Sequence, residues 1–396
     1  MASKLIAPMA SPSQSTGFFR TLSWAVYLGC SWTWCIGMFL PVIMVREYGV
    51  AAWFVFAIPN VLGAAAMGWV LNRPDASEHL VANHRTACVA FSAITLAFHA
   101  YFLIWLSHAH IIPVAWSIAA IVAGTAFAWI GRSKSTVDLL LAWMVLAVSL
   151  AVLIKGLLGF NIGDTQGIYP EQAKVALPSL APVCLFGFLL CPYLDLTFHR
   201  ARQSNSISAS KLAFGIGFGV VFLAMIFLTL LYTGDFADAT WADRFGSFGK
   251  AGLMTWVAAH MAAQSGFTWT AHLRALPRLK KKDCFIWLVA AVMVGAAAFF
   301  LSQQEYFDLA RPNMLTGDAI YRIFMAFYGL VFPAYVWMFM VPIQGQTPAR
   351  QPKSIAVFVV AILIAALMFW GAFIAGHMLW LWPALAIVLA SRWVAK

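Results

Sequence analysis

The sequence predicts an all-α integral membrane protein of about twelve transmembrane helices. Of its 396 residues, 63% are hydrophobic and 10% are charged, and the mean hydropathy is +0.84. This composition is too apolar to cover a soluble globule with polar surface. Apolar segments of spanning length recur along the chain, and basic residues alternate between loops as membrane topology requires. Lipid is therefore the expected solvent for most of the chain.

Each predicted span is an apolar segment long enough to cross a bilayer. The first 19 residues carry Pro and Ser without a continuous apolar stretch, so we expect a short cytoplasmic tail rather than a cleaved signal peptide. The predicted spans cover residues 20–45, 50–71, 86–107, 111–130, 137–160, 176–198, 210–233, 249–272, 284–301, 317–341, 354–375 and 377–394.

The distribution of basic residues sets the orientation. With the N-terminus inside, eighteen of the 25 Lys and Arg residues fall in cytoplasmic segments and six on the opposite side, while Lys155 lies within the fifth span. This asymmetry is typical of the positive-inside rule and predicts a multi-pass protein of the cell inner membrane with both termini in the cytoplasm. The formal charge of +11 is explained by topology, so we expect no nucleic-acid partner.

The cysteines predict neither a disulfide nor a metal site, because no zinc-ligand spacing occurs. Small polarizable packing residues are the expected role. The cytoplasmic loops are short, so any chemistry has to be done by the spans themselves. Five cysteines lie in apolar segments and the sixth lies beside a Lys run: Cys30, Cys35, Cys88, Cys184, Cys191 and Cys284.

The first and sixth spans carry a related Gly/Pro interruption. The first reads SWTWCIGMFLP, with Gly37 and Pro41 around a predicted break after Ser31 and Thr33; the sixth reads APVCLFGFLLCPYLDLTFHR, with Gly187 and Pro192. Interrupted spans in corresponding halves indicate ligand sites near the membrane midplane. We expect Gly37 and Gly187 to lie at the interruptions and to face each other. The alternative is that these residues are ordinary, since Gly and Pro are frequent in membrane helices.

An odd number of crossings separates these two spans, so they run in opposite directions. This is the geometry of an inverted five-helix repeat. The predicted organisation is a first repeat over residues 20–160, a second repeat over residues 176–341 and two additional helices over residues 354–394.

The stretch from SWTWCIGMFL through REYGVAAWFVFAIPNVLGAAAMGWVL resembles the opening spans of the sodium/solute symporters. These belong to the wider amino-acid/polyamine/organocation superfamily, which shares the LeuT fold. The resemblance implies that fold, with a Gly-bearing broken helix, a Tyr-Gly turn and a Gly-rich second span. A major-facilitator transporter would share the topology, but its usual Gly- and Arg-rich loop is replaced here by NRPDASEHLVANHR.

Few ionisable groups lie inside the predicted spans, and each is costly to bury in lipid. Asp195 follows the predicted break in the sixth span, where it would ligand a cation, relay a proton or bind an amine. The alternative is a structural anchor paired with His199 or Arg200. The resemblance implies that Lys155 replaces a sodium ion, as a fifth-helix lysine does in some proton-coupled members; the alternative is snorkelling to the interface.

A polar stripe marks the eighth span. His260, Gln264 and Thr268 repeat at intervals of four residues and therefore share one helix face, with Ser265 beside them. We expect this face to lie with Asp195 around the cytoplasmic half of a cavity. The resemblance implies that Ser265 and Thr268, with carbonyls of the broken first helix, hold sodium. Interhelical hydrogen bonding is the alternative role.

These features together predict a secondary active transporter of a small polar solute, driven by a proton or sodium gradient, and not an enzyme. The expected partners are the solute and membrane lipid. The alternatives are a membrane enzyme or a haem- or metal-carrying protein, with His99 and His260 as ligands, and a transporter-like solute sensor. The candidate solute-binding residues are Trp34, Cys35, Gly37, His99, Gly187, Tyr193, His260, Gln264 and Tyr328.

Overall fold

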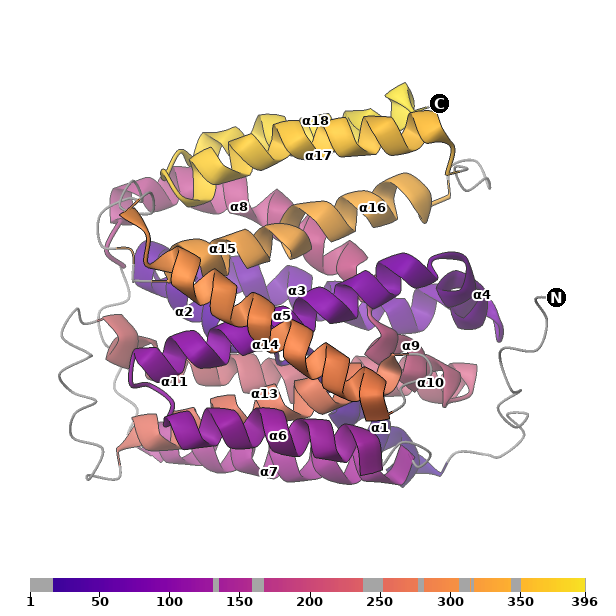
Figure 1. Ribbon diagram of the computed structural model, residues 1–396, viewed down its shortest axis with the longest axis vertical. Helices are drawn as coiled ribbons and strands as arrows, with labels where there is room; N and C mark the ends of the chain where they lie inside the picture. Colours follow the sequence, from indigo (N-terminus) through magenta and orange to yellow (C-terminus); the bar gives the residue numbers. More distant parts are fainter. Residues whose placement is uncertain are drawn as a thin grey trace.

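The computed structural model describes residues 17–130, 135–158, 167–237, 252–276, 281–305, 314, 317–342 and 350–395. Every regular element in these ranges is helical, and the helices run back and forth between two ends of the molecule (Figure 1). We call the end at which α1 begins and α18 ends the basic end, and the other the opposite end. Most of the predicted tail and parts of several predicted loops lie outside the described residues, as does the side chain of Cys284.

Many large apolar side chains face outward, among them Leu158 at 83% and Leu367 at 73% exposure. A soluble protein rarely exposes apolar surface on this scale. Eight described helices are long and apolar enough to cross a membrane, or nine if the bent pair α1–α2 forms one span. The chain is thus a multi-pass, all-helical membrane protein.

Each of the twelve predicted segments contains a helix. When α1–α2 is counted as one span, three segments remain outside the group of nine: the 17-residue α6, the segment η5–α18 and the more polar α13. The helices are α1 (Phe18–Trp32), α2 (Cys35–Tyr48), α3 (Ala51–Val70), α4 (Ala76–Asn83), α5 (Arg85–His108), α6 (Val114–Ile130), α7 (Ser135–Leu158), α8 (Pro170–Leu190), η1 (Cys191–Leu194), α9 (Leu196–Gln203), α10 (Ile207–Ile216), η2 (Gly217–Phe222), α11 (Leu223–Ala237), α13 (Leu253–Ala275), α14 (Lys281–Ser302), α15 (Asp318–Ala326), η4 (Phe327–Val331), α16 (Phe332–Phe339), α17 (Pro352–Phe373), η5 (Met378–Trp380) and α18 (Leu381–Val394).

The first span is broken where the sequence predicts it. Helix α1 ends at Trp32, Trp34 is extended, and α2 starts at Cys35 after a bend of 55°. The hydroxyl of Thr33 donates to the carbonyl of Gly29 at 2.8 Å, and the backbone N–H of Thr33 donates to the same carbonyl at 3.1 Å. The backbone between α1 and α2 is therefore open to side chains from neighbouring helices.

The sixth span is also broken, after Leu190. Its α-helix gives way to the 3₁₀ turn η1, which contains Pro192, and α9 begins after the extended residue Asp195. Proline lacks the N–H that would continue the α-helical hydrogen bonds.

The expectation that Gly37 and Gly187 mark the breaks is wrong. Gly37 lies inside α2 and Gly187 inside α8. A Cβ on Gly37 would lie nearest the ring of Phe222, whereas one on Gly187 would lie 2.7 Å from the carbonyl oxygen of Tyr328. Each glycine permits close helix packing, and the two do not face each other.

The two broken spans lie antiparallel. Near the breaks, the hydroxyl oxygen of Thr197 at the start of α9 lies 3.3 Å from that of Ser31 at the end of α1. At the opposite end, the N–H groups of Ile168 and Tyr169 donate to the carbonyls of Arg46 and Glu47, both at 2.9 Å. The second half of the first span is thus tied to the start of the sixth.

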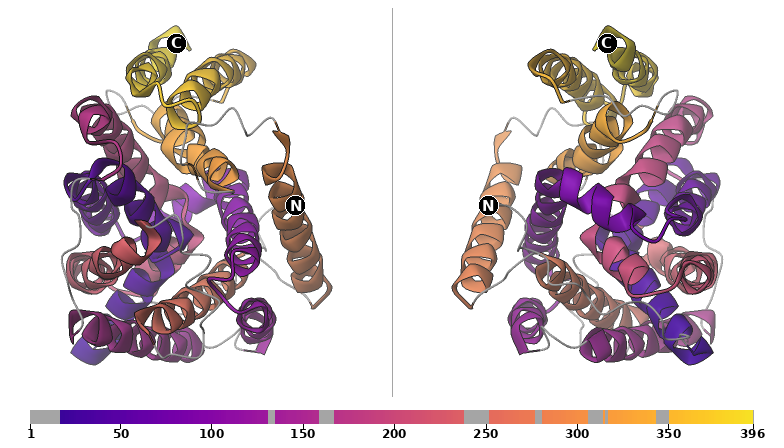
Figure 2. Two further views of the ribbon diagram at one scale, coloured as in Figure 1. Left: turned by 90° about the vertical axis from the view of Figure 1, so that its left-hand side faces the viewer. Right: turned by 90° about the vertical axis from the view of Figure 1, so that its right-hand side faces the viewer.

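The other helices pack against one another in pairs. Helix α3 packs on α8, whereas α10, η2 and α11 pack on α1 and α2. Helix α14 packs on α5, whereas α13 packs on α6. Helices α17 and α18 pack on each other at one edge of the molecule, near α8 and α15–α16 (Figure 2).

Candidate functional site

A small pocket lies beside the two breaks, and we call it the central pocket. Its walls include four aromatic side chains, the amide of Asn60 and the thiol of Cys191. No lining side chain is ionisable at neutral pH, so the pocket suits an uncharged group that stacks on rings and hydrogen-bonds to an amide. It is lined by Trp32, Trp34, Ile36, Asn60, Phe188, Cys191 and Tyr328.

Hydrogen bonds fix the side chains of the central pocket. The indole N–H of Trp32 donates to Oδ1 of Asn60 at 2.6 Å. The Tyr328 hydroxyl bonds to the Thr95 hydroxyl at 2.9 Å, and the Cys191 thiol donates to the Tyr328 carbonyl at 3.2 Å. Residues from α1, α3, α5, η1 and η4 thereby converge on one point, as a site needs if its side chains are to be held in place.

The ring of Trp34 packs into the break itself. Its centroid lies 4.6 Å from that of Trp32 and 5.4 Å from those of Phe91, His272 and Tyr328. Its indole N–H donates to the carbonyl of Ser31, and only 1% of the residue is exposed. Trp34 therefore stabilises the non-helical backbone as well as forming a wall of the pocket.

His99 supports the start of α2. Its Nε2 accepts the backbone N–H of Cys35 at 3.4 Å, and its Nδ1 lies 2.8 Å from the carbonyl oxygen of Thr95. Because a carbonyl can only accept, Nδ1 carries the proton and the ring is neutral. The carbonyl of Cys35 also accepts the hydroxyl of Tyr321, at 2.9 Å. Both nitrogens of His99 are occupied, which favours a role at the break over metal ligation.

The sequence analysis missed His272. This residue is buried on α13, its ring stacks edge-on to Trp34, and Nδ1 lies 3.1 Å from the Ser92 hydroxyl. The spacing of polar residues does indicate His272, because it follows Thr268 by four residues and extends the polar stripe by one turn.

The remainder of the polar stripe on α13 is buried, but its residues do not line the central pocket. His260 and Gln264 both contact the Ser149 hydroxyl, at 3.0 and 3.1 Å. The amide of Gln264 also lies 3.0 Å from the sulfur of Met225, and that sulfur lies 3.6 Å from the Thr33 hydroxyl oxygen. Gln264 is thus linked to the first break through the sulfur of Met225.

Two hydroxyls on α13 are buried without a hydrogen-bond partner among the described residues. These are Oγ of Ser265 and Oγ1 of Thr268, each on a residue about 1% exposed. Buried hydroxyls normally find a partner. The pair is therefore available to a bound ion or water.

Asp195 caps α9. Its Oδ1 accepts from both the backbone N–H and the hydroxyl of Thr197, each at 2.7 Å, while Oδ2 has no partner among the described residues. The alternative role, a structural anchor paired with His199 or Arg200, does not match the contacts that these two residues make. The imidazole of His199 bonds to the Ser77 hydroxyl and to the Tyr193 carbonyl, and Arg200 pairs with Asp138.

A buried ion-pair cluster lies at the basic end, and we call it the three-charge cluster. Asp138 of α7 pairs with Arg200 of α9 and with Arg274 of α13, the latter at 2.7 Å. The hydroxyl of Tyr27 lies within electrostatic range of all three and of Asp195. The cluster thus brings two guanidinium groups to one carboxylate.

A second buried cluster, the four-charge cluster, lies at the opposite end between α2 and α15. Arg322 pairs with Glu47 at 2.5 Å, and Arg46 pairs with Asp318 at 3.2 Å. Arg322 also lies 3.7 Å from Asp318. Two cations and two carboxylates give the cluster no net charge.

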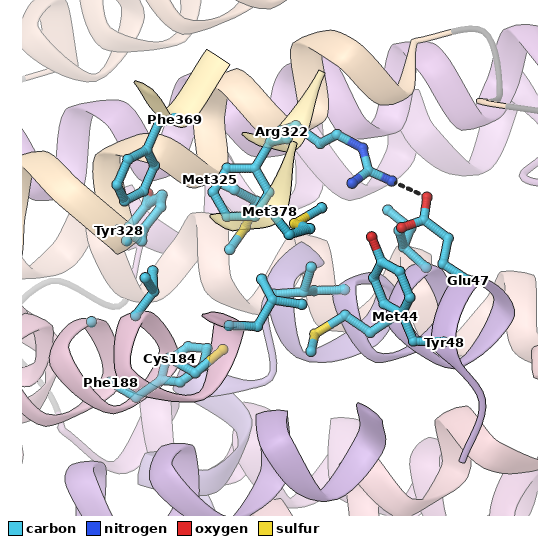
Figure 3. A pocket seen from close by; sticks show the side chains of 17 residues that line it. Met44, Glu47, Tyr48, Cys184, Phe188, Arg322, Met325, Tyr328, Phe369 and Met378 are labelled. Atoms are coloured by element: carbon cyan, nitrogen blue, oxygen red, sulfur yellow. Dashed lines mark hydrogen bonds and ion pairs between the residues drawn. The ribbon is translucent and has the colours of Figure 1, made fainter. Parts of the chain in front are cut away.

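The cluster borders a larger cavity between α2, α8, α15–η4 and α17, which we call the outer cavity (Figure 3). Glu47 and Arg322 lie at one side of it, and Tyr328 and Phe188 line both this cavity and the central pocket. Gly187, a predicted solute-binding residue, lines the outer cavity only.

Three further predicted residues lie away from both cavities. Gly37 packs on α11 and η2, Tyr193 is half-buried in η1, and Lys155 is exposed near the end of α7. The position of Lys155 favours snorkelling rather than a site inside the bundle.

No group of three or more potential His, Cys, Asp or Glu ligands to a metal occurs in the described part of the chain. No family model, curated protein or solved structure matches the sequence. The likeness of the opening spans to sodium/solute symporters consequently stays a prediction.

Proposed function

We propose that the protein is a secondary active transporter of a small, uncharged polar solute, driven by a proton or sodium gradient. The observation that carries this proposal is the meeting of two antiparallel interrupted helices, α1–α2 and α8–α9, beside an aromatic pocket. Unwound backbone is tolerated in a membrane protein where it lines a cavity or is buried in protein. In transporters, such interruptions form the solute site.

The pairing of helices supports an inverted repeat of two five-span halves, followed by two additional spans. If the two halves are exchanged, the packing of α3 on α8 becomes that of α10–α11 on α1–α2. The packing of α14 on α5 likewise becomes that of α13 on α6. The two charge clusters also correspond to each other when the halves are exchanged, because one joins α2 to α15 and the other joins α9 to α7. We take this arrangement as a LeuT-like fold with twelve spans and both termini in the cytoplasm.

The two charge clusters also favour alternating access. Each connects the helix beyond a break, α2 or α9, to a neighbouring helix, one at each end of the molecule. Both clusters are formed in the structure. We propose that each side opens when its cluster separates, as a transporter rocks around a fixed site.

Asp195, Ser265 and Thr268 are the proposed coupling residues. Each is buried and has an oxygen without a partner among the described residues. Carboxylate and hydroxyl oxygens suit a sodium ion, and a carboxylate also relays protons. Asp195 caps the short helix α9, so a change in the charge of Asp195 would act on the element that we expect to move.

Solute-dependent thermal stabilisation of the purified chain tests this proposal, because a ligand that binds only the folded state raises Tm. Uncharged nucleobases, sugars and amides form the positive set, with charged amino acids and amines for comparison. The variant Asn60→Ala should abolish the stabilisation, whereas Asn72→Ala, on an exposed loop, should preserve it. Stabilisation that survives Asn60→Ala, or that only charged solutes produce, would contradict the assignment of the pocket.

A further inference from the structure

The outer cavity is almost entirely apolar. Its walls include three flexible methionines, Met44, Met325 and Met378, and two phenylalanines of α17, Phe369 and Phe373. Cavities with apolar walls stay dry, and an unfilled one forfeits packing energy. Methionine adapts to irregular or varied ligands. The walls therefore fit an apolar body rather than water.

One side of the cavity differs from the rest. Glu47 and Arg322 lie there as a buried ion pair (Figure 3), and Nε of Arg322 has no hydrogen-bond partner among the described residues. Arg322 is only 7% exposed. Because the four-charge cluster is already neutral, a charged ligand would unbalance it at a desolvated position. An uncharged acceptor, such as a hydroxyl, would take the Nε–H without that cost.

We propose that the outer cavity binds an uncharged amphiphile, with its apolar chain between α8, η4 and α17 and its hydroxyl or carbonyl head at Arg322. The cavity is separated from the central pocket by Phe188 and Tyr328. One of its walls, α17, turns apolar residues such as Leu363 and Leu367 outward, which suits a ligand that dissolves in the bilayer. The site does not depend on the transport function.

A photoactivatable ten-carbon alcohol tests the site on the full chain in lipid nanodiscs. We expect labelling on peptides of α8, α15–η4 and α17, and we expect excess plain decanol to suppress it. Decanoate and decylamine should compete less well than decanol. Labelling that decanol does not suppress, or that is confined to the outward faces of α6 and α14, would overturn the proposal. Stronger competition by either charged compound would overturn the assignment of the head group.

Variants that fill the cavity sharpen the test. Val183→Phe should lower the suppressible labelling by about tenfold, the effect of roughly 1.4 kcal/mol in binding. Val360→Phe, on the exposed side of α17, is the matched control and should leave it unchanged. Gly329→Ala is a milder variant, because its Cβ would lie 3.5 Å from Val183 and Phe369 without a clash. Undiminished labelling in a folded Val183→Phe variant would also refute the site. If Val183→Phe does not fold, undiminished labelling in Gly329→Ala would refute it instead.

Discussion

The two ends of the molecule are held by different kinds of charge cluster. At the opposite end, two arginines meet two carboxylates, and all four come from α2 and α15. At the basic end, two arginines from α9 and α13 share the single carboxylate of Asp138. The first cluster has alternative pairings, whereas both ion pairs of the second include Asp138.

This difference has a mechanical consequence in the proposed transport cycle. Buried ion pairs add little net stability, but removing one partner is costly because a charge is left unpaired. The four-charge cluster can lose one pairing and keep another. Both ion pairs of the three-charge cluster include Asp138, so we expect the basic end to be the more sensitive of the two to changes in charge.

The largest effect is expected at Asp138. Replacing it with Asn breaks the ion pairs to Arg200 and Arg274 together, at a cost of about 3–5 kcal/mol. Thermal unfolding should show a clearly lowered Tm. Glu171→Gln, which removes an exposed pair with Lys174, is the control and should change Tm little. Equal effects of the two variants would mean that the three-charge cluster does not hold the basic end.

Glu47→Gln should have a smaller effect. Arg322 loses its closest carboxylate but keeps Asp318 at 3.7 Å, so we expect a loss of about 1–3 kcal/mol. The same unfolding measurement checks this, with Glu78→Gln on the exposed side of α4 as the control. A larger loss than that of Asp138→Asn would reverse the ranking of the two ends.

The cap of α9 offers a change that separates stability from coupling. Asp195→Ala removes the cap and should cost about 1 kcal/mol, whereas Asn caps nearly as well as Asp. Asp195→Asn should therefore unfold close to the parent temperature. A strongly destabilised Asn variant would show that the negative charge, and not the cap, stabilises the basic end.

The smallest effect concerns pH. His84, at the basic end outside the spans, bonds to the Tyr335 hydroxyl at 3.0 Å. Burial, aided by Arg350, lowers its pKa from 6.5 to about 4. The stabilising contribution of the neutral ring is therefore full above pH 6.5 and is lost as the pH falls toward 4. His84→Gln should reduce this acid sensitivity, measured as Tm against pH, whereas His79→Gln in an exposed pair should not.

The sequence predicted the helices and the first break better than it predicted side-chain partners. The break after Thr33 was predicted from local composition, since Gly37, Pro41 and two hydroxyl residues cluster there. The roles of Gly37 and Gly187 were not, because a glycine needed for close packing looks the same in a sequence as one needed at a break. Only the approach of Tyr328 to Gly187 distinguishes the two.

The charge clusters could not be predicted for a different reason. Arg46, Glu47 and Arg322 lie near the ends of spans, where charged residues are usually solvated, and the topology rule treats them as loop charges. Their partners lie more than 270 positions away in the chain. Asp195 was singled out correctly as a buried acid, yet its bonds to Thr197 follow from the turn that precedes α9.

Gradient-driven uptake into proteoliposomes tests the central claim most directly. A solute that stabilises the parent should accumulate above its external concentration when a proton or a sodium gradient is imposed, and only one of the two should drive it. Asp195→Asn should still bind the solute but lose this accumulation. Equal accumulation by Asp195→Asn would rule out a coupling role for Asp195. Binding without accumulation by the parent under either gradient would contradict the transporter itself and favour a solute sensor.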